Sequence, residues 1–321
     1  MTTRSLAPLL AAALLLPACS KKADRPEVVR LDFAYYNPVS LLLKEKRFLE
    51  DDLAKDGVKV EWTQSLGSNK ALEFLASRSV DFGSTAGVAA LLARANGNPV
   101  KSVYVYSRPE WTALVTTPAS GIQSVADLRG KRVAVTRGTD PHIFLLRALD
   151  QAGLSDKDVE IVPLQHPDGK IALERGDVAA WSGLDPLMAT TEAEKGSKLF
   201  FRNPDWNTYG VLNVREEFAQ KYPAYVERVI GAYEKARQFS LAHPDELQGI
   251  LQREAKLTEP VAKAVLGRTD LSRPLIGEAQ RTTIVAAGSV LKKSGIVKQD
   301  TDVDAVAAAL IEPSFAKKVV Q

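Results

Sequence analysis

Apolar residues along the first two-thirds of the chain follow two periods in turn. Short runs rich in Val, Leu and aromatic residues are typical of buried strands, and segments with an apolar residue every three or four positions are typical of amphipathic helices. This pattern predicts strands at 29–36, 58–63, 80–84, 100–106, 132–136, 159–164, 178–181 and 199–201, and helices at 38–55, 69–77, 87–96, 140–152, 169–176 and 185–195. Strands that alternate with helices predict an α/β fold with largely parallel sheet.

Beyond Asn213 the strand-like runs stop. Only helical periods follow, at 216–243, 245–254, 259–266, 277–295 and 303–310. The sequence therefore predicts a helical C-terminal tail.

Two apolar stretches interrupt the alternation, WTALVTT at 111–117 and YGVLNV at 209–214. We interpret both as strands by which the chain leaves a first lobe and returns to it. The expected division is lobe 1 at 29–114 plus 213–321 and lobe 2 at 115–212, with a cleft between them. The alternative is one large domain in which both stretches are ordinary sheet strands.

The chain begins with MTTRSLAPLLAAALLLPAC. A single Arg4 precedes an apolar run that is too short to span a bilayer, which is typical of a secretory signal peptide. We assign 1–18 to the signal and the polar segment 19–28 to a tether. The tetrapeptide that ends at Cys19 resembles a bacterial lipobox, so Cys19 is the expected lipid attachment point. The alternative is an ordinary signal that happens to end in cysteine.

Composition excludes several classes of protein. The hydrophobic fraction of 45% argues against global disorder, and a net charge of +3 argues against a nucleic-acid-binding protein. One cysteine and three scattered histidines argue against a disulfide framework and against a metal site. We expect neither a metal nor any other cofactor, so the chemistry must come from hydroxyls, amides, aromatic rings and a few charges.

Polar residues and glycines follow the predicted strands, where open parallel sheets bind ligands. The candidate binding residues are Tyr36, Asn37, Ser84, Thr85 and Ala86 in lobe 1 and Gly138, Thr139, Asp140, His142, Trp181 and Asp185 in lobe 2. Hydroxyl groups and free N–H groups at helix starts suit an anion. Taken singly, Ser84, Thr139, Asp140 and Asp185 could be plain helix caps, and Trp181 could be core.

Several of these segments together resemble a known family. The residues are VDFGS at 80–84, SVADLRGKRVAV at 124–135, GTDPH at 138–142, ALERGDVAAW at 172–181 and the pair at 185–186. In this order they resemble the periplasmic solute-binding proteins of ABC importers for aliphatic sulfonates, a group that also takes taurine, nitrate and thiamin-precursor pyrimidines.

The resemblance implies a two-lobed clamshell of type II with two hinge strands. It also implies that the turns at 84–86 and 138–140 hold the sulfonate oxygens, that Tyr36 and Asn37 face the ligand, and that His142 and Trp181 line the cleft. The expected protein is a periplasmic monomer that delivers a small anion to an ABC permease. Where the family often has aromatic residues on both sides of the Asp-Pro pair, this chain has Leu184 and Leu187.

Three alternatives remain open from the sequence. The ligand could be taurine, nitrate or a pyrimidine. The chain could be an enzyme of the thiamin-precursor type, although its histidines, His142, His166 and His243, lie in separate segments and it has neither a Gly-x-Ser-x-Gly elbow nor a phosphate-binding loop. It could also be a lipoprotein that binds no small ligand.

Overall fold

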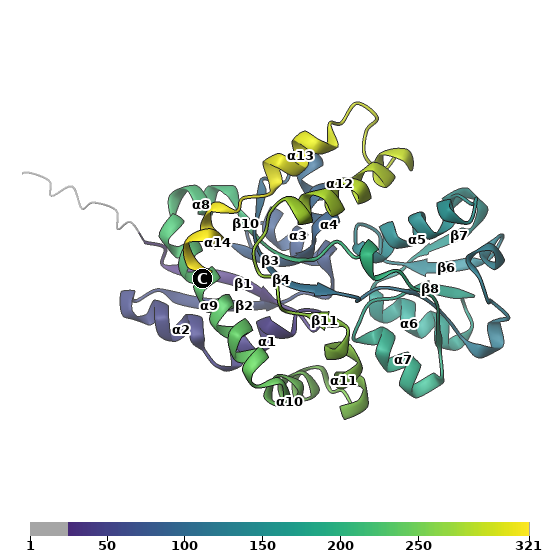
Figure 1. The fold of residues 1–321 in the computed structure, drawn as a ribbon, viewed down its shortest axis with the longest axis horizontal. Coiled ribbons are helices and arrows are strands. Elements are labelled where there is room, and N and C mark those ends of the chain that lie inside the picture. The colour runs from purple at the N-terminus through teal and green to yellow at the C-terminus, as the bar shows by residue number, and fades with distance from the viewer. Residues whose placement is uncertain (1–24, 321) are drawn as a thin grey trace, which may run out of the picture.

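The computed structural model describes residues 25–320, and they form two lobes, each built on its own sheet (Figure 1). The predicted signal peptide, Cys19 and most of the tether lie outside the described residues. The strands of the first sheet, in spatial order, are β11 (Thr269–Asp270), β4 (Val100–Pro109), β10 (Gly210–Arg215), β3 (Phe82–Ala86), β1 (Val28–Phe33) and β2 (Lys59–Gln64). Those of the second sheet are β7 (Glu160–Pro163), β6 (Arg132–Val135), β8 (Ala180–Ser182), β5 (Leu114–Thr116) and β9 (Lys198–Phe201). We call the first sheet with its helices lobe 1 and the second lobe 2.

Both sheets are mixed, which differs from the largely parallel sheet expected from the sequence. In lobe 1, β1 pairs in parallel with β2 and β3, whereas β10 is antiparallel to β3 and β4. In lobe 2, β6 pairs in parallel with β7 and β8, whereas β5 is antiparallel to β8 and β9. The reversed strands β5 and β10 are those by which the chain enters each lobe, so their direction follows from the path between the lobes and not from a βα unit.

The chain crosses between the lobes twice. The first crossing, 110–113, joins β4 to β5, and the second, 202–209, joins β9 to β10. The boundaries expected from the sequence fall at the start of β5 and within β10. Residues 216–320 return to lobe 1 and pack around its sheet (Figure 1).

The helices largely follow the predicted periods. In lobe 1 they are α1 (Pro38–Glu45), α2 (Phe48–Leu53), α3 (Ser68–Ala76), α4 (Gly87–Ala95), α8 (Glu216–Lys221), α9 (Pro223–Ala242), α10 (Pro244–Ala255), α11 (Glu259–Gly267), α12 (Glu278–Lys293), α13 (Val303–Leu310) and α14 (Ser314–Val319). In lobe 2 they are α5 (Asp140–Gln151), α6 (His166–Arg175) and α7 (Leu187–Lys195).

Three differences from the predicted elements have physical causes. The helix expected at 38–55 is broken at Arg47, whose φ of 54° lies in the left-handed region, and the break lets Leu49 and Leu53 be fully buried. The helix expected from 169 begins at His166, because Pro167 occupies its first turn. The short strand β11 interrupts the expected helical tail and extends the edge of the first sheet beside β4.

Each lobe has its own core. One large cluster of buried side chains fills lobe 1 and extends to Ile143, Leu184 and Ala189 of lobe 2, and two smaller clusters lie within lobe 2, one with α5 and one with α6. Among residues 25–320, no helix has the length and apolarity that crossing a bilayer requires.

Candidate functional site

A small cavity of about 10 Å³, roughly the space of one water molecule, lies between the two lobes. It is lined by Tyr36 and Ser68 of lobe 1, by Thr139, Asp140, Pro141, His166 and Leu184 of lobe 2, and by Trp111 of the first crossing. We call this space the head cavity. Its lining residues come from both lobes, as expected for a cleft between them.

A second, wider pocket of about 180 Å³ adjoins the head cavity and shares Tyr36, His166 and Leu184 with it. Its remaining lining residues are Tyr35, Ser65, Leu66, Pro167, Asp185, Pro186, Leu187, Ala255 and Leu257. We call it the outer pocket. Most of these side chains are apolar, and Leu66 is half exposed at its rim. The outer pocket therefore suits an apolar group that extends from the head cavity toward solvent.

Three helices begin at the head cavity. The first residues of α3, α5 and α6 are Ser68, Asp140 and His166, and all three line it. The N–H groups of a helix's first turn have no acceptor within the helix, and the helix dipole makes this end favourable for negative charge. The convergence of three such ends, from two lobes, favours an anion in the head cavity.

The N-terminus of α4, where the sequence placed another binding turn, is already occupied by the protein. The N–H of Gly87 donates to the carbonyl oxygen of Thr208 at 3.1 Å, and the N–H of Val88 donates to Thr208 Oγ1 at 3.0 Å. Thr208 belongs to the second crossing, so this contact joins α4 to the chain between the lobes.

The lobe 1 residues expected at the site divide into one that lines the head cavity and four that lie beneath it. Tyr36 lines the cavity and donates its hydroxyl to the Ser84 carbonyl at 2.9 Å. Asn37 Nδ2 donates to Ser84 Oγ at 2.9 Å, and Asn213 Nδ2 donates to Thr85 Oγ1 at 2.7 Å. Ser84, Thr85 and Ala86 are fully buried inside strand β3 and form no turn. Of these three, Ser84 supports Tyr36 directly, because its carbonyl accepts the Tyr36 hydroxyl.

A buried carboxyl, Asp32, anchors this support. It lies near the end of β1, accepts from Ser65 Oγ at 2.6 Å and from the N–H of Ser84 at 2.7 Å, and is fully buried. Burial raises the pKa of Asp32 to about 7, and these hydrogen bonds only partly oppose the effect.

Replacing Asp32 with asparagine is expected to change how stability depends on pH. Because its pKa is raised from 3.8 to about 7, the folded chain keeps a proton that the unfolded chain loses. Its contribution to the free energy of unfolding therefore falls by about 4 kcal/mol as pH rises from about 4 to 7. Urea unfolding at several pH values should show the wild-type chain losing stability relative to Asp32→Asn over this range. A pH-independent difference between the two would contradict the shift.

The lobe 2 residues expected at the site also take different positions. Thr139 lines the head cavity, but its hydroxyl donates to the Thr136 carbonyl at 2.6 Å. The N–H of Gly138 lies 3.5 Å from His142 Nδ1, which accepts it, and burial lowers the pKa of His142 to about 4. Trp181 belongs to the lobe 2 core, where its indole packs so closely on Gly169 that a Cβ there would lie 2.7 Å from Nε1.

Asp140 connects lobe 2 to both crossings. Its Oδ2 accepts from Trp111 Nε1 and from the N–H of Thr208, both at 2.9 Å, and its Oδ1 accepts from Thr208 Oγ1 at 2.8 Å. Burial raises the pKa of Asp140, and the bonds from Thr208 and Trp111 oppose the rise. Because both carboxylate oxygens are hydrogen-bonded to the crossings, Asp140 mainly connects α5 to the chain between the lobes.

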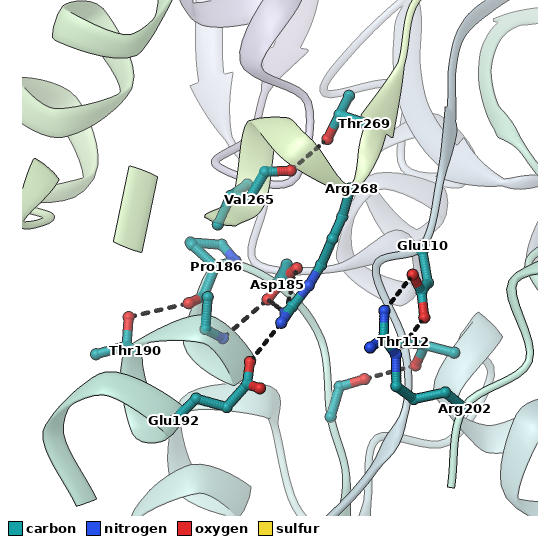
Figure 2. A network of polar contacts seen from close by, with 12 residues as sticks. Glu110, Thr112, Asp185, Pro186, Thr190, Glu192, Arg202, Val265, Arg268 and Thr269 are labelled. Atoms are coloured by element: carbon teal, nitrogen blue, oxygen red, sulfur yellow. Dashed lines mark hydrogen bonds and ion pairs between the residues drawn. The ribbon is translucent and has the colours of Figure 1, made fainter. Parts of the chain in front are cut away.

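A polar network spans the two lobes beside the outer pocket (Figure 2). Arg268, which follows α11 of lobe 1, lies 3.3 Å from Asp185 Oδ2 and 2.7 Å from Glu192 Oε2, both in lobe 2. Asp185 also caps α7 by accepting the N–H of Ala189 at 2.9 Å. Burial raises the pKa of Asp185 to about 6, and the charge of Arg268 opposes the rise. Opening of the cleft would separate Arg268 from both acids.

The same view shows how the two crossings are joined to each other (Figure 2). Glu110 of the first crossing accepts two hydrogen bonds, each 2.7 Å long, from the guanidinium of Arg202 in the second. Paired hydrogen bonds of this kind fix the relative orientation of both partners.

Five cavity-lining residues are absent from the set predicted by sequence: Ser68, Trp111, Pro141, His166 and Leu184. Ser68 and His166 share the sequence feature that identified the other candidates, because each is a polar residue that follows a predicted strand and begins a helix. Pro167 indicates that the helix begins at His166, since proline favours the first turn of a helix. Trp111 lies in a stretch that the sequence analysis assigned to the hinge alone.

Known proteins share this architecture. The chain is 28% identical over 243 residues, 75% of its length and 76% of the relative's, to an Escherichia coli K12 protein named as an aliphatic sulfonates-binding protein. The alkanesulfonate-binding protein SsuA from Xanthomonas axonopodis pv. citri, solved with bound MOPS, superposes with a TM-score of 0.81 at 23% identity, over 89% of this chain and 98% of that one. The desulfurization enzyme DSZB also superposes, with a TM-score of 0.66 at 16% identity, over 92% of this chain and 99% of that one.

These likenesses confirm the expected fold, an α/β periplasmic-binding-protein architecture with two mixed sheets and a helical C-terminal region. A family model described as NMT1/THI5 like matches residues 53–247. That match covers more than half of the 321 residues. The chain belongs to the NMT1/THI5-like family.

Proposed function

We propose that this protein is the substrate-binding component of an ABC importer and that it carries aliphatic sulfonates. The observation on which the proposal depends is the head cavity, where the first residues of α3, α5 and α6 meet between two lobes. The sulfonate group binds at the head cavity, which widens to admit it when the lobes move apart, and the aliphatic tail extends into the outer pocket. The closed form then docks on a membrane permease and releases its ligand there.

The chemistry of the head cavity suits a sulfonate. A buried anion requires hydrogen bonds that replace its water shell. Helix N–H groups supply some of them, and Ser68 Oγ supplies another, because it accepts from the N–H of Ala86 at 2.9 Å and keeps its own hydrogen for the cavity. Within the described residues 25–320, no lysine or arginine lines the cavity. A sulfonate carries one negative charge and stays ionised near neutral pH, so neutral donors can hold it.

The route to the periplasm belongs to the same proposal. Residues 1–18 direct export, and acylation at Cys19 tethers the mature chain to the membrane through the short segment that precedes lobe 1. The relatives that support the transport assignment bear the names of binding proteins.

A thermal-shift screen tests the proposal and separates it from the other ligand classes. Butanesulfonate and ethanesulfonate are expected to raise Tm in proportion to the logarithm of their concentration. Taurine, nitrate, sulfate and a thiamin-precursor pyrimidine serve as rival ligands. A larger shift with a rival than with either alkanesulfonate would reassign the ligand, and chemical turnover of the sulfonate by pure protein would favour an enzyme.

The variant Ser68→Ala is expected to weaken butanesulfonate binding about 10-fold, since it removes one hydrogen bond to a charged group. Isothermal titration calorimetry measures the change. Ser77→Ala, at the exposed C-terminal end of the same helix, is the matched control. Ser84→Ala and Thr139→Ala are expected to act less directly, because both hydroxyls engage protein groups. Unchanged affinity in Ser68→Ala would remove α3 from the site.

A further inference from the structure

His166 is a buried histidine whose ring nitrogens have no partner. It is 1% exposed, and neither Nδ1 nor Nε2 has a hydrogen-bond partner within residues 25–320. It lines both the head cavity and the outer pocket, at the point where the two spaces adjoin. Burial lowers the pKa of His166 to about 3, so the ring is neutral.

An unpartnered buried polar atom costs roughly 1–3 kcal/mol, so proteins seldom retain one without a reason. The other buried histidine of lobe 2 shows the usual outcome, because His142 Nδ1 accepts the N–H of Gly138. A neutral imidazole offers one N–H donor and one acceptor nitrogen. In His166 both remain available to a molecule inside the cleft.

The position of His166 makes it part of the closed cleft. The ring lies against the turn that begins α3 in lobe 1, where a Cβ on Gly67 would be 3.1 Å from His166 Cδ2 and 3.2 Å from Nε2. Beside it, Asn69 Nδ2 reaches across to Gln165 Oε1 at 3.4 Å, and Asn69 Oδ1 is also buried without a partner. Closure of the lobes therefore buries the ring against lobe 1.

We propose that His166 hydrogen-bonds directly to the bound ligand as a neutral donor and thereby selects for a singly charged anion. The inference rests on the proposed function and extends it, because it names a specificity-determining residue. The N–H of the ring donates to a sulfonate oxygen from the lobe 2 side of the cleft.

The choice of a neutral ring has a consequence for ligand charge. The ionisable groups that line the two spaces around His166 are Tyr35, Tyr36, Asp140 and Asp185, and the arginine beside Asp185, Arg268, already pairs with Asp185 and Glu192. Nothing in this set offsets a second negative charge. Phosphonates and sulfate, which carry up to two negative charges near neutral pH, are therefore disfavoured relative to alkanesulfonates.

Calorimetric titration of four proteins with butanesulfonate and with butylphosphonate at pH 7.5 tests the proposal. His166→Leu is expected to bind butanesulfonate 10- to 100-fold more weakly, as expected for loss of a hydrogen bond to a charged group. His166→Gln, which retains an N–H donor, is expected to stay within about 5-fold of the wild type. His243→Gln, on the exposed surface of lobe 1, is the control and is expected to match the wild type. The wild type is expected to prefer the sulfonate.

A direct readout separates ligand contact from a structural role. In protein labelled with ¹⁵N-histidine, butanesulfonate should shift the ring resonances that are missing from His166→Gln, and it should leave those of His243 in place. Wild-type affinity in His166→Leu, or unshifted His166 resonances at saturation, would overturn the inference while leaving the proposed function intact. If the wild type binds no sulfonate at all, both proposals fail together.

Discussion

Replacement of Asp140 by alanine is expected to lower the free energy of unfolding by about 3–5 kcal/mol at neutral pH. The carboxylate satisfies three buried donors, namely Trp111 Nε1, the N–H of Thr208 and Thr208 Oγ1. Alanine would leave all three without a partner. The variant should also bind butanesulfonate more weakly, because both crossings lose their connection to α5.

Chemical denaturation measures the loss of stability, and Asp140→Asn tests how much of it depends on the acceptor oxygens. Asparagine keeps one acceptor oxygen and should recover part of the stability. Asp177→Ala, on the exposed surface of lobe 2, is the control and should change stability by less than about 0.5 kcal/mol. A loss below about 1 kcal/mol in Asp140→Ala would mean that the three donors find water or other partners.

The second large effect concerns affinity. Arg268→Ala is expected to weaken butanesulfonate binding about 10- to 100-fold, because the closed form would bury Asp185 without its cation. In the open form the lobes separate and the acid meets water, so the penalty falls on closure. The unfolding transition of the ligand-free protein should therefore change less than the affinity does.

The pH dependence of this variant gives a second check. Burial already raises the pKa of Asp185 to about 6 while Arg268 is present, and removal of the cation raises it further. Burying a protonated carboxyl costs less free energy than burying a carboxylate, so the affinity of Arg268→Ala should recover as pH falls from 8 to 5. Arg281→Ala removes an arginine whose two acidic partners, Glu278 and Asp304, lie in lobe 1 itself, and it should leave affinity unchanged. Equal affinities for Arg268→Ala and the wild type would show that the network does not hold the closed form.

Much of the fold could be predicted because side-chain periodicity is a local property. The strand expected at 132–136 is β6, the helix expected at 140–152 is α5, and the stretch at 209–214 is β10, which carries the chain back into lobe 1. The direction of the strands could not be predicted in the same way. The path between the lobes, and not the local pattern, makes β5 and β10 antiparallel.

The site was predicted in outline and not in detail. Strand periodicity placed Ser84 and Trp181 near strand ends, but it did not show that Ser84 belongs to the strand interior or that Trp181 packs into the lobe 2 core. Asp140 had two interpretations, cap or ligand contact, and its hydrogen bonds to the crossings correspond to neither. The contact that Arg268 makes between the lobes could not be predicted, because its partners at 185 and 192 are distant in sequence.

Trp111 is both a wall of the head cavity and a residue of the first crossing. Of the four tryptophans, Trp62 lies on strand β2, Trp181 is in the lobe 2 core and Trp206 stacks under Arg147. Indole emission responds to the polarity around the ring, so ligand capture should alter the fluorescence of Trp111 most strongly. The protein thus carries a built-in optical probe, and capture can be followed in time without any label.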